Sequence, residues 1–265
     1  KGHVWSFCFG LLGLLAAWRL TARIGGERAG FWALLLLVTV PRYYGHMFFN
    51  PKDIPLAATY LLGLWALVEL FSKLPRPPWC AVLWVGCAAG LAMSARIAGL
   101  LILGYFALFV FLYLCVKYFA ALRTERTVTR AEVVKDLGYW SIRGATSGVV
   151  ALLVLSVFWP AIHTNPVERM EQTVATVQSY GWGGVVLMDG HFWQASDLPF
   201  YYIPYWLLYT IPESVLILIG LSLLFGGMSL LRYRRTGQWP SASELWPRLL
   251  LVFAVLFPLC YLLWK

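Results

Sequence analysis

The sequence predicts an all-α fold, a polytopic transmembrane helix bundle, on three observations. Hydrophobic residues make up 60% of the 265 residues, charged residues make up only 12%, and the mean hydropathy is +0.71. Soluble globular domains carry about 25% charged residues, so most of this surface is unsuited to water. Long apolar runs, each near the length of about 20 residues that crosses a bilayer, alternate with short polar segments.

About eight runs are candidate spans, and together they predict a single transmembrane domain over residues 1–265. The candidates are 4–22, 30–49, 54–72, 79–95, 97–116, 145–163, 204–231 and 247–264. Two long connections remain: a basic cytoplasmic loop at 117–144, expected to be partly helical along the membrane surface, and an outer loop at 160–203. The outer loop predicts a short helix at 165–178. Aromatic residues from 198 onward predict an interfacial helix that leads into the next span.

The net charge of +9 does not indicate a nucleic-acid partner, because the basic residues lie at the ends of the apolar runs. Their distribution predicts the orientation in the membrane instead. With the N-terminus outside, the cytoplasmic loops hold fifteen of the 21 Lys and Arg residues, which follows the positive-inside rule. These fifteen are Arg19, Arg23, Arg28, Lys73, Arg76, Lys117, Arg123, Arg126, Arg130, Lys135, Arg143, Arg232, Arg234, Arg235 and Arg248. The sequence thus predicts an integral membrane protein without a nucleic-acid partner.

The cysteines and the chain ends give further expectations. All five cysteines lie in apolar runs, so we expect neither a disulfide nor a cysteine metal site. The chain opens at Lys1 without an initiator Met or a signal peptide, and it ends at Lys265 just after an apolar run. These features predict a piece of a longer protein.

In this orientation the outer face carries the groups that can do chemistry. All four histidines and six of the twelve acidic residues fall there, while the cytoplasmic loops hold no histidine. Outer loops must hold some polar residues in any case, so the asymmetry alone does not assign a function. A divalent metal ion is a further candidate because histidines and carboxylates share this face, but no ligand spacing supports one and no metal ligand is assigned.

The short outer connection at 41–55 is the most informative segment. It places Arg42, His46, Asn50, Lys52 and Asp53 within 12 residues at the depth of the lipid headgroups. Charged groups at such depth are costly and usually face a cavity or a partner. A structural interpretation remains open, in which Asp53 is a helix N-cap and the two cations extend toward lipid phosphate. The density of polar types favours a substrate-binding site.

Two further residues stand out. Arg96 lies between two apolar runs with almost no loop; it either marks a turn or holds a lipid-linked phosphate, which a guanidinium matches in a bidentate way. Glu213, after Pro212, lies one turn inside the next span and is either paired in the bundle or part of the outer cavity. The tripeptide Asp189-Gly190-His191 is typical of a turn.

Three segments carry a family resemblance. The span that ends in Pro41-Arg42, the string HMFFNPKDIP at 46–55, and the string DLPFYYIPYW at 197–206 with TIPE at 210–213 resemble GT-C fold glycosyltransferases. The branch is that of bacterial relatives of dolichyl-phosphate-mannose–protein mannosyltransferase and lipid A aminoarabinose transferase. The likeness follows the order of the spans over nearly the whole chain.

The resemblance implies a glycosyltransferase that moves a sugar from a polyprenyl-phosphate donor, with inversion, to a hydroxyl on a protein, lipid or glycan. It implies a bacterial inner (plasma) membrane protein with its active site on the outer face. Asp53 matches the family's second outer acidic position and is the catalytic candidate. Lys52 and Arg96 are candidates for the donor phosphate.

One departure from the family pattern concerns the catalytic acid. The family's main catalytic acid lies in the first outer loop, whereas this chain begins at what resembles the second span. The C-terminal part of the family also has no counterpart, so the piece is expected to be inactive alone.

Two other classes of function remain. A polytopic transporter or flippase, for a lipid-linked or small solute, would place ionisable groups near the bilayer midplane and often contain repeats. Here the charges gather at the outer boundary, and no repeat is found. A purely structural membrane protein would explain the aromatic residues but not the polar turn at 42–53.

Overall fold

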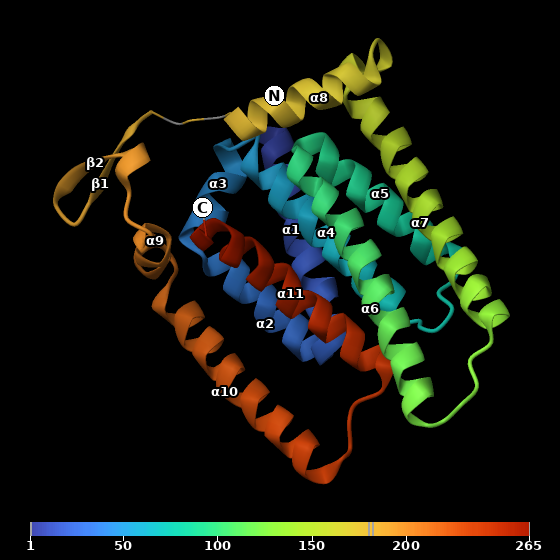
Figure 1. Cartoon of the computed structure of the whole chain (residues 1–265). Helices are drawn as coiled ribbons and strands as arrows, with labels where there is room; N and C mark the ends of the chain where they lie inside the picture. Colours follow the sequence, from blue (N-terminus) through green and yellow to red (C-terminus); the bar gives the residue numbers. More distant parts are fainter. Residues whose placement is uncertain (1, 180, 182, 265) are drawn as a thin grey trace. The chain divides into compact units, whose positions relative to one another are not determined.

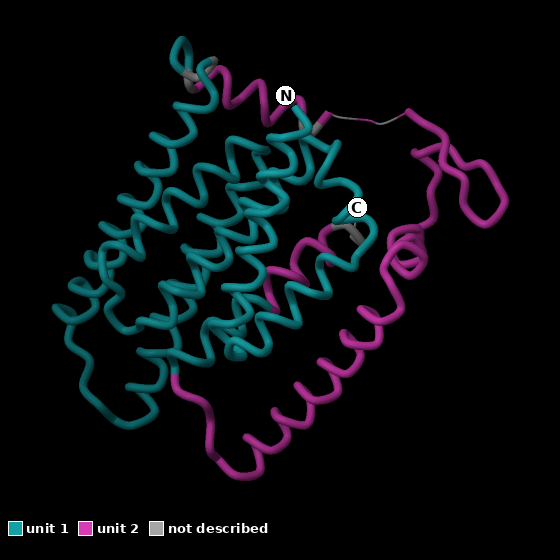
Figure 2. The backbone as a smooth tube through the Cα atoms, turned by 180° about the vertical axis from the view of Figure 1, so that it is seen from behind, with its two compact units in different colours: residues 1–166, 242–251 teal, residues 167–241, 252–265 magenta. Residues whose placement is uncertain are grey.

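The computed structural model describes residues 2–179, 181 and 183–264, and the predicted chain ends Lys1 and Lys265 lie outside the described residues (Figure 1). The described chain is helical apart from one two-stranded hairpin, which confirms the all-α prediction. Contacts divide it into two compact units, residues 1–166 with 242–251 and residues 167–241 with 252–265 (Figure 2). That residues 1–265 act as a single transmembrane domain remains a prediction.

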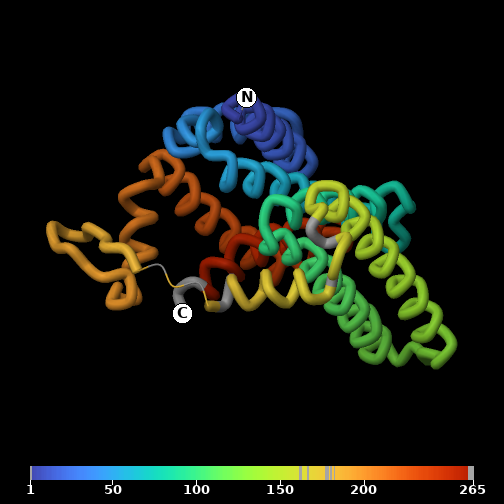
Figure 3. The backbone as a smooth tube through the Cα atoms, turned by 90° about the horizontal axis from the view of Figure 1, so that it is seen from above, coloured from blue at the N-terminus to red at the C-terminus, as the bar shows by residue number. Residues whose placement is uncertain are grey.

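The first unit is a series of packed helices. α1 contacts α2, α3 and α4, then α4 contacts α5, and α5 contacts α7; α1 in blue and α7 in yellow-green lie at opposite ends of this series (Figure 3). The elements are α1 (Gly2–Gly25), α2 (Glu27–Thr39), α3 (Pro41–Phe49), α4 (Asp53–Phe71), α5 (Trp79–Ala95), η1 (Ile97–Leu100), α6 (Leu101–Arg123), α7 (Arg130–Phe158) and η2 (Pro160–His163).

The second unit holds the predicted outer loop and the next helix. Its elements are α8 (Pro166–Ser179), β1 (Val185–Met188), β2 (His191–Gln194), η3 (Ala195–Asp197), α9 (Tyr202–Thr210) and α10 (Glu213–Thr236). α8 begins at the boundary between the units, and α11 (Ala242–Trp264) starts in the first unit and continues in the second. The helix predicted at 165–178 corresponds to α8.

Six described helices are long and apolar enough to cross a membrane, which supports an integral membrane protein. They are Gly2–Gly25, Asp53–Phe71, Ile97–Arg123, Arg130–Phe158, Glu213–Thr236 and Ala242–Tyr261, and they correspond to six of the eight predicted spans. The predicted span at 79–95 forms α5, whose 17 residues extend about 26 Å. It is thus slightly shorter than the hydrocarbon core of about 30 Å.

The predicted span at 30–49 is not one helix. It is broken at Val40, which has an extended backbone (φ −71°, ψ 110°) between α2 and α3. A residue that precedes proline is disfavoured in the helical region, and Pro41 then opens α3 as its first residue. The apolar run is continuous in sequence, but the backbone turns within it.

The predicted cytoplasmic loop at 117–144 consists mostly of the ends of two long helices, rather than of a helix along the membrane surface. α6 continues to Arg123, α7 begins at Arg130, and the Thr129 side chain caps α7 by accepting from the Glu132 N–H at 3.3 Å. An ion pair between Lys117 and Asp136 joins the two helices. α7 is 29 residues long, about 43 Å, and so exceeds the hydrocarbon thickness.

Close backbone contact joins α5 to α7. A Cβ atom added at Gly86 would lie 2.7 Å from the Ser147 carbonyl oxygen, and one at Gly90 would lie 2.6 Å from that of Ala151. Small residues four positions apart allow helix backbones to approach each other, the common mode of helix association in lipid. The Ser147 hydroxyl also donates to the Val82 carbonyl at 2.9 Å.

Two turns in the second unit follow proline and glycine rules. Asp189 (φ 52°) and Gly190 (φ 76°) form the two-residue turn between β1 and β2, as expected of the Asp-Gly pair. Ile211 is extended before Pro212, so the predicted span at 204–231 divides into α9 and α10. Glu213 is therefore the first residue of α10, which corrects the prediction that it lies one turn inside a span.

The contact between α5 and α7 predicts the effect of Gly90→Ala. We expect a loss of about 1–3 kcal/mol in the free energy of unfolding, because the new methyl meets backbone that has no room to move. Gly104→Ala is the control, since a Cβ there meets no atom within 4 Å, and both changes raise helix propensity equally. Thermal unfolding in nanodiscs measures the difference. Equal midpoints for the two variants would contradict this packing.

Candidate functional site

The turn between α3 and α4 is built around the side chain of Asn50. Its Oδ1 accepts hydrogen bonds from the backbone N–H groups of Lys52, at 3.1 Å, and Asp53, at 2.9 Å. These N–H groups would otherwise have no partner at the start of α4. Lys52 is the N-cap residue of α4 and its own side chain makes no capping bond, so Asn50 supplies the acceptor instead, and Asp53 is the first residue of the helix. This corrects the alternative in which Asp53 itself is the N-cap.

The amide nitrogen of Asn50 joins two titratable side chains. Nδ2 donates to Oδ2 of Asp53 at 2.9 Å and lies 2.8 Å from Nδ1 of His46. His46 is one helical turn before Asn50, so the end of α3 brings the imidazole to the amide. The His46 ring also lies 5.2 Å from the ring of Phe49.

Arg96 completes the cluster from a distant part of the chain. Its Nη2 donates to Oδ1 of Asp53 at 2.7 Å, across a separation of 43 residues. Arg96 has an extended backbone (φ −157°, ψ 150°) between α5 and η1. The following turn requires Gly99, because a Cβ there would lie 2.3 Å from the backbone of Ala92 and Met93. This close turn sets where the guanidinium stands.

Contacts with α1 hold α3 in place. The Tyr43 hydroxyl donates to the carbonyl of Gly10 at 2.8 Å, and the absence of a side chain at Gly10 makes room for the buried Met47. At the end of α3, Nδ1 of His3 lies 2.8 Å from the carbonyl oxygen of Phe48. These contacts fix the helix that carries His46.

The cluster lies at the surface of the first unit. The side chains of Asp53 and Arg96 are 58% and 49% exposed, so a substrate can reach both. An ion pair this exposed contributes only about 0–1 kcal/mol to stability. The pair therefore contributes little to the stability of the fold.

The structure joins four of the predicted site residues, namely His46, Asn50, Asp53 and Arg96. Lys52 is exposed beside Asp53, and no ion pair of its ammonium is found in the described part of the chain. Arg42 is exposed in the first turn of α3. Glu213 belongs to the second unit, so its predicted place in the same cavity remains a prediction.

The bridging role of Asn50 was missed from the sequence, where Asn50 was only one of several polar residues. The spacing could have indicated it, since His46 and Asn50 are four residues apart at the end of a helix, where side chains meet. Asn50 also precedes Lys52 and Asp53 by two and three residues, the spacing at which an Asn side chain accepts from nearby backbone N–H groups in a turn. Tyr43, which anchors α3, was not singled out either.

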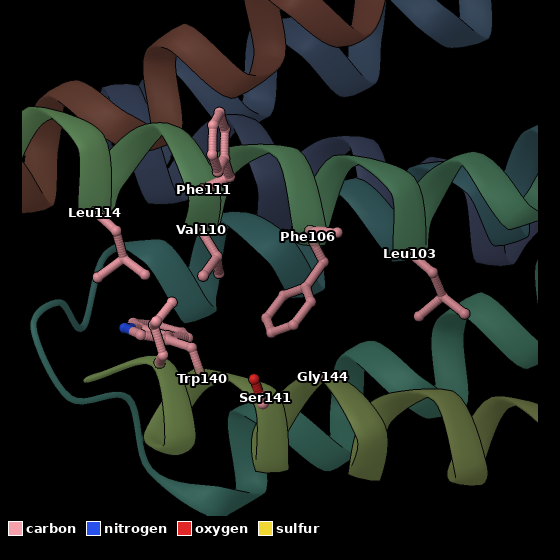
Figure 4. A pocket seen from close by; sticks show the side chains of 10 residues that line it. Leu103, Phe106, Val110, Phe111, Leu114, Trp140, Ser141 and Gly144 are labelled. Carbon is pink, nitrogen blue, oxygen red and sulfur yellow. The ribbon is translucent and has the colours of Figure 1, made fainter. Parts of the chain in front are cut away.

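No group of three or more histidine, cysteine or acidic side chains in residues 2–179, 181 and 183–264 is arranged to hold a metal ion. The divalent ion considered from the sequence remains a prediction. An apolar groove of about 360 Å³ lies between α6 and α7, lined mostly by side chains such as Phe106, Val110 and Trp140 (Figure 4). Its lining contains none of the predicted site residues, and its chemistry suits a hydrocarbon rather than a sugar.

Comparison with known protein families gives one match. Residues 3–127 match the family model described as dolichyl-phosphate-mannose-protein mannosyltransferase. This part of the chain is similar to that family, which is of the GT-C type. It includes α1 to α6, and with them the whole cluster from His46 to Arg96. Comparisons with curated proteins and with solved structures gave no match.

The match confirms the resemblance drawn from the string at 46–55. It supports a membrane glycosyltransferase of the GT-C type as the general class. The family name also implies a lipid-linked sugar donor and a membrane setting. The mannosyltransferase relationship therefore covers the segment in which the four joined residues lie.

The exposure of the ion pair predicts its contribution to stability. Asp53→Ala and Arg96→Ala, alone and together, are expected to give a coupling energy of no more than about 1 kcal/mol, because solvent screens the pair. Thermal unfolding of the three variants and the parent measures it. A coupling of several kcal/mol would mean that the pair is buried and structural in the native membrane.

Proposed function

We propose that the chain is a membrane glycosyltransferase that moves a sugar from a polyprenyl-phosphate donor to a hydroxyl acceptor on the outer face. The acceptor hydroxyl belongs to a protein, lipid or glycan, and the membrane is a bacterial inner (plasma) membrane. One observation carries the proposal: a carboxylate and a guanidinium, 43 residues apart, meet at an exposed helix end inside the segment related to mannosyltransferases.

Asp53 is the proposed base. The acceptor oxygen attacks the anomeric carbon while the bond from that carbon to the phosphate oxygen breaks, and the hydroxyl proton passes to the Asp53 carboxylate. A single displacement inverts the anomeric centre and releases the polyprenyl phosphate. General base catalysis of this kind contributes about 10²–10⁴-fold to rate.

Arg96 and Lys52 are the proposed cations for the donor phosphate. A guanidinium carries five N–H donors, and the contact with Asp53 uses Nη2, so other donors of Arg96 remain for phosphate oxygens. The exposed Lys52 ammonium lies next in sequence to Asp53 and adds a second positive charge. Cations placed where the leaving phosphate gains charge stabilise the transition state.

The carboxylate and the cations must cooperate. Arg96 donates to one oxygen of the Asp53 carboxylate, the group proposed to accept the proton. A donor phosphate that binds Arg96 competes with Asp53 for the same cation and so leaves the carboxylate freer to act as a base. His46, Asn50, Arg42 and Glu213 remain candidates for substrate binding.

Asp53→Asn tests the proposed base. We expect transfer to fall by about 10²–10⁴-fold, because an amide cannot accept the acceptor proton. The assay measures transfer from radiolabelled polyprenyl-phosphate sugars in membranes that contain the protein as it occurs in the cell. Glu125→Gln is the control, because it removes an exposed carboxylate of the predicted cytoplasmic side.

Full transfer by Asp53→Asn would reject the proposed base. Solute uptake into vesicles, without any sugar transfer, would favour the transporter alternative.

Lys52→Ala tests phosphate binding. We expect the donor KM to rise about fivefold, since one basic side chain near an anionic surface contributes about 1 kcal/mol, with a smaller change in kcat. Lys73→Ala is the matched control, because Lys73 pairs with Glu69 at 3.6 Å at the other end of α4. A KM that rises equally in both variants would indicate a general effect of surface charge.

A further inference from the structure

The hydrogen bonds of Asn50 determine which atom of His46 carries the proton. Two backbone N–H groups, of Lys52 and Asp53, point at one end of the amide. Only the oxygen can accept them, so the Asn50 NH₂ group occupies the other end. The network thus fixes the orientation of the amide.

The NH₂ group has two hydrogens and two neighbours. One neighbour is Oδ2 of Asp53 at 2.9 Å, and the other is Nδ1 of His46 at 2.8 Å. Because both hydrogens point outward from the amide, Nδ1 of His46 must act as an acceptor. A neutral imidazole with an accepting Nδ1 carries its hydrogen on Nε2.

We propose that His46 and Asn50 are positioning residues for Asp53, and that the site is assembled only while His46 is neutral with its proton on Nε2. This inference rests on the proposed function, in which Asp53 is the base. Protonation of Nδ1 would place an N–H against the N–H of Asn50. The amide would then have to turn, and Asp53 would lose the hydrogen bond that orients one of its oxygens.

A turned amide affects both functions of Asn50. Its oxygen also caps α4, so rotation would exchange acceptor and donor at the helix start and place NH₂ against two backbone N–H groups. The neutral state of His46 is therefore linked to the start of α4 and to the carboxylate there. Arg96 alone would still hold the other oxygen of Asp53.

The neighbours of His46 include several groups that carry or can carry charge. They are His3 of α1, Arg42 and the hydroxyls of Tyr43 and Tyr44 on α3, Lys52 and Asp53 at the start of α4, and Arg96 after α5. The part of α2 from residue 29 to Thr39 contains no titratable side chain. His3 is the other imidazole among these neighbours. Its Nδ1 faces a carbonyl oxygen, that of Phe48, so it must donate there and keeps this bond when the ring is protonated.

The pH dependence of sugar transfer tests the inference. We expect the wild-type rate to fall severalfold from pH 7.5 to pH 5.5, the range in which imidazole side chains as a class gain a proton. His3→Asn is the control and is expected to show the same fall.

Two substitutions of His46 separate positioning from mere packing. His46→Asn keeps an acceptor where Nδ1 stands but cannot be protonated, so the ratio of its rates at pH 7.5 and pH 5.5 stays near one, whatever its rate at pH 7.5. His46→Leu has no acceptor, so its rate is low at both pH values. The wild-type fall retained in His46→Asn, or a wild-type profile in His46→Leu, would overturn the inference.

A readout independent of transfer keeps the inference distinct from the proposed function. In protein labelled with ¹⁵N-histidine and ¹³C-aspartate, Nδ1 of His46 is expected to appear unprotonated at pH 7.5, with the signal assigned from its loss in His46→Asn. The Asp53 carboxyl signal is expected to shift with the titration of His46 in the wild type only. The inference is overturned if Nδ1 is protonated at pH 7.5, or if the Asp53 carboxyl signal does not follow the titration of His46. Either result holds even if Asp53→Asn abolishes transfer.

Conversely, full transfer by Asp53→Asn rejects the proposed base. In that case the two NMR signals alone decide whether His46 positions Asp53.

Discussion

The hydrogen bonds of one amide, that of Asn50, hold the candidate site together. Its oxygen closes the start of α4, and its nitrogen joins the imidazole of His46 to the carboxylate of Asp53. Each bond constrains the others because an amide has one acceptor end and one donor end. The site is therefore a single electrostatic unit, in which the geometry of the backbone turn and the protonation of a side chain cannot vary independently.

Glycines supply the close contacts that support this unit. At Gly10 the missing side chain makes room for Met47, and at Gly99 the chain turns directly onto the backbone of α5. Lipid provides no hydrophobic force between helices, so such close packing and the few interhelical hydrogen bonds must hold the bundle. The hydrogen bond from Tyr43 to Gly10 is of this kind. Close contacts at these glycines thus help to position α3 and Arg96.

The sequence predicted the helical class and most spans because hydropathy needs only composition over about 20 residues. It did not predict the break at Val40, because hydropathy averaged over a window does not register a single proline, although Pro41 disfavours a helical backbone at Val40. The polar turn at 42–53 and Arg96 were singled out for the cost of charge in lipid. Their meeting could not be predicted, because it depends on how α4 and α5 pack, which no local pattern encodes.

The break at Val40 also makes α3 a helix in its own right rather than the continuation of α2. The Val40 N–H bonds to the Leu36 carbonyl in the last turn of α2, and the Val40 carbonyl accepts from the Tyr44 N–H in the first turn of α3, so this extended residue ends one helix and starts the next. The direction of α2 therefore does not dictate that of α3. The imidazole of His46 takes its place from α1, through the contacts of Tyr43 and Phe48, rather than from the helix that precedes it in the sequence.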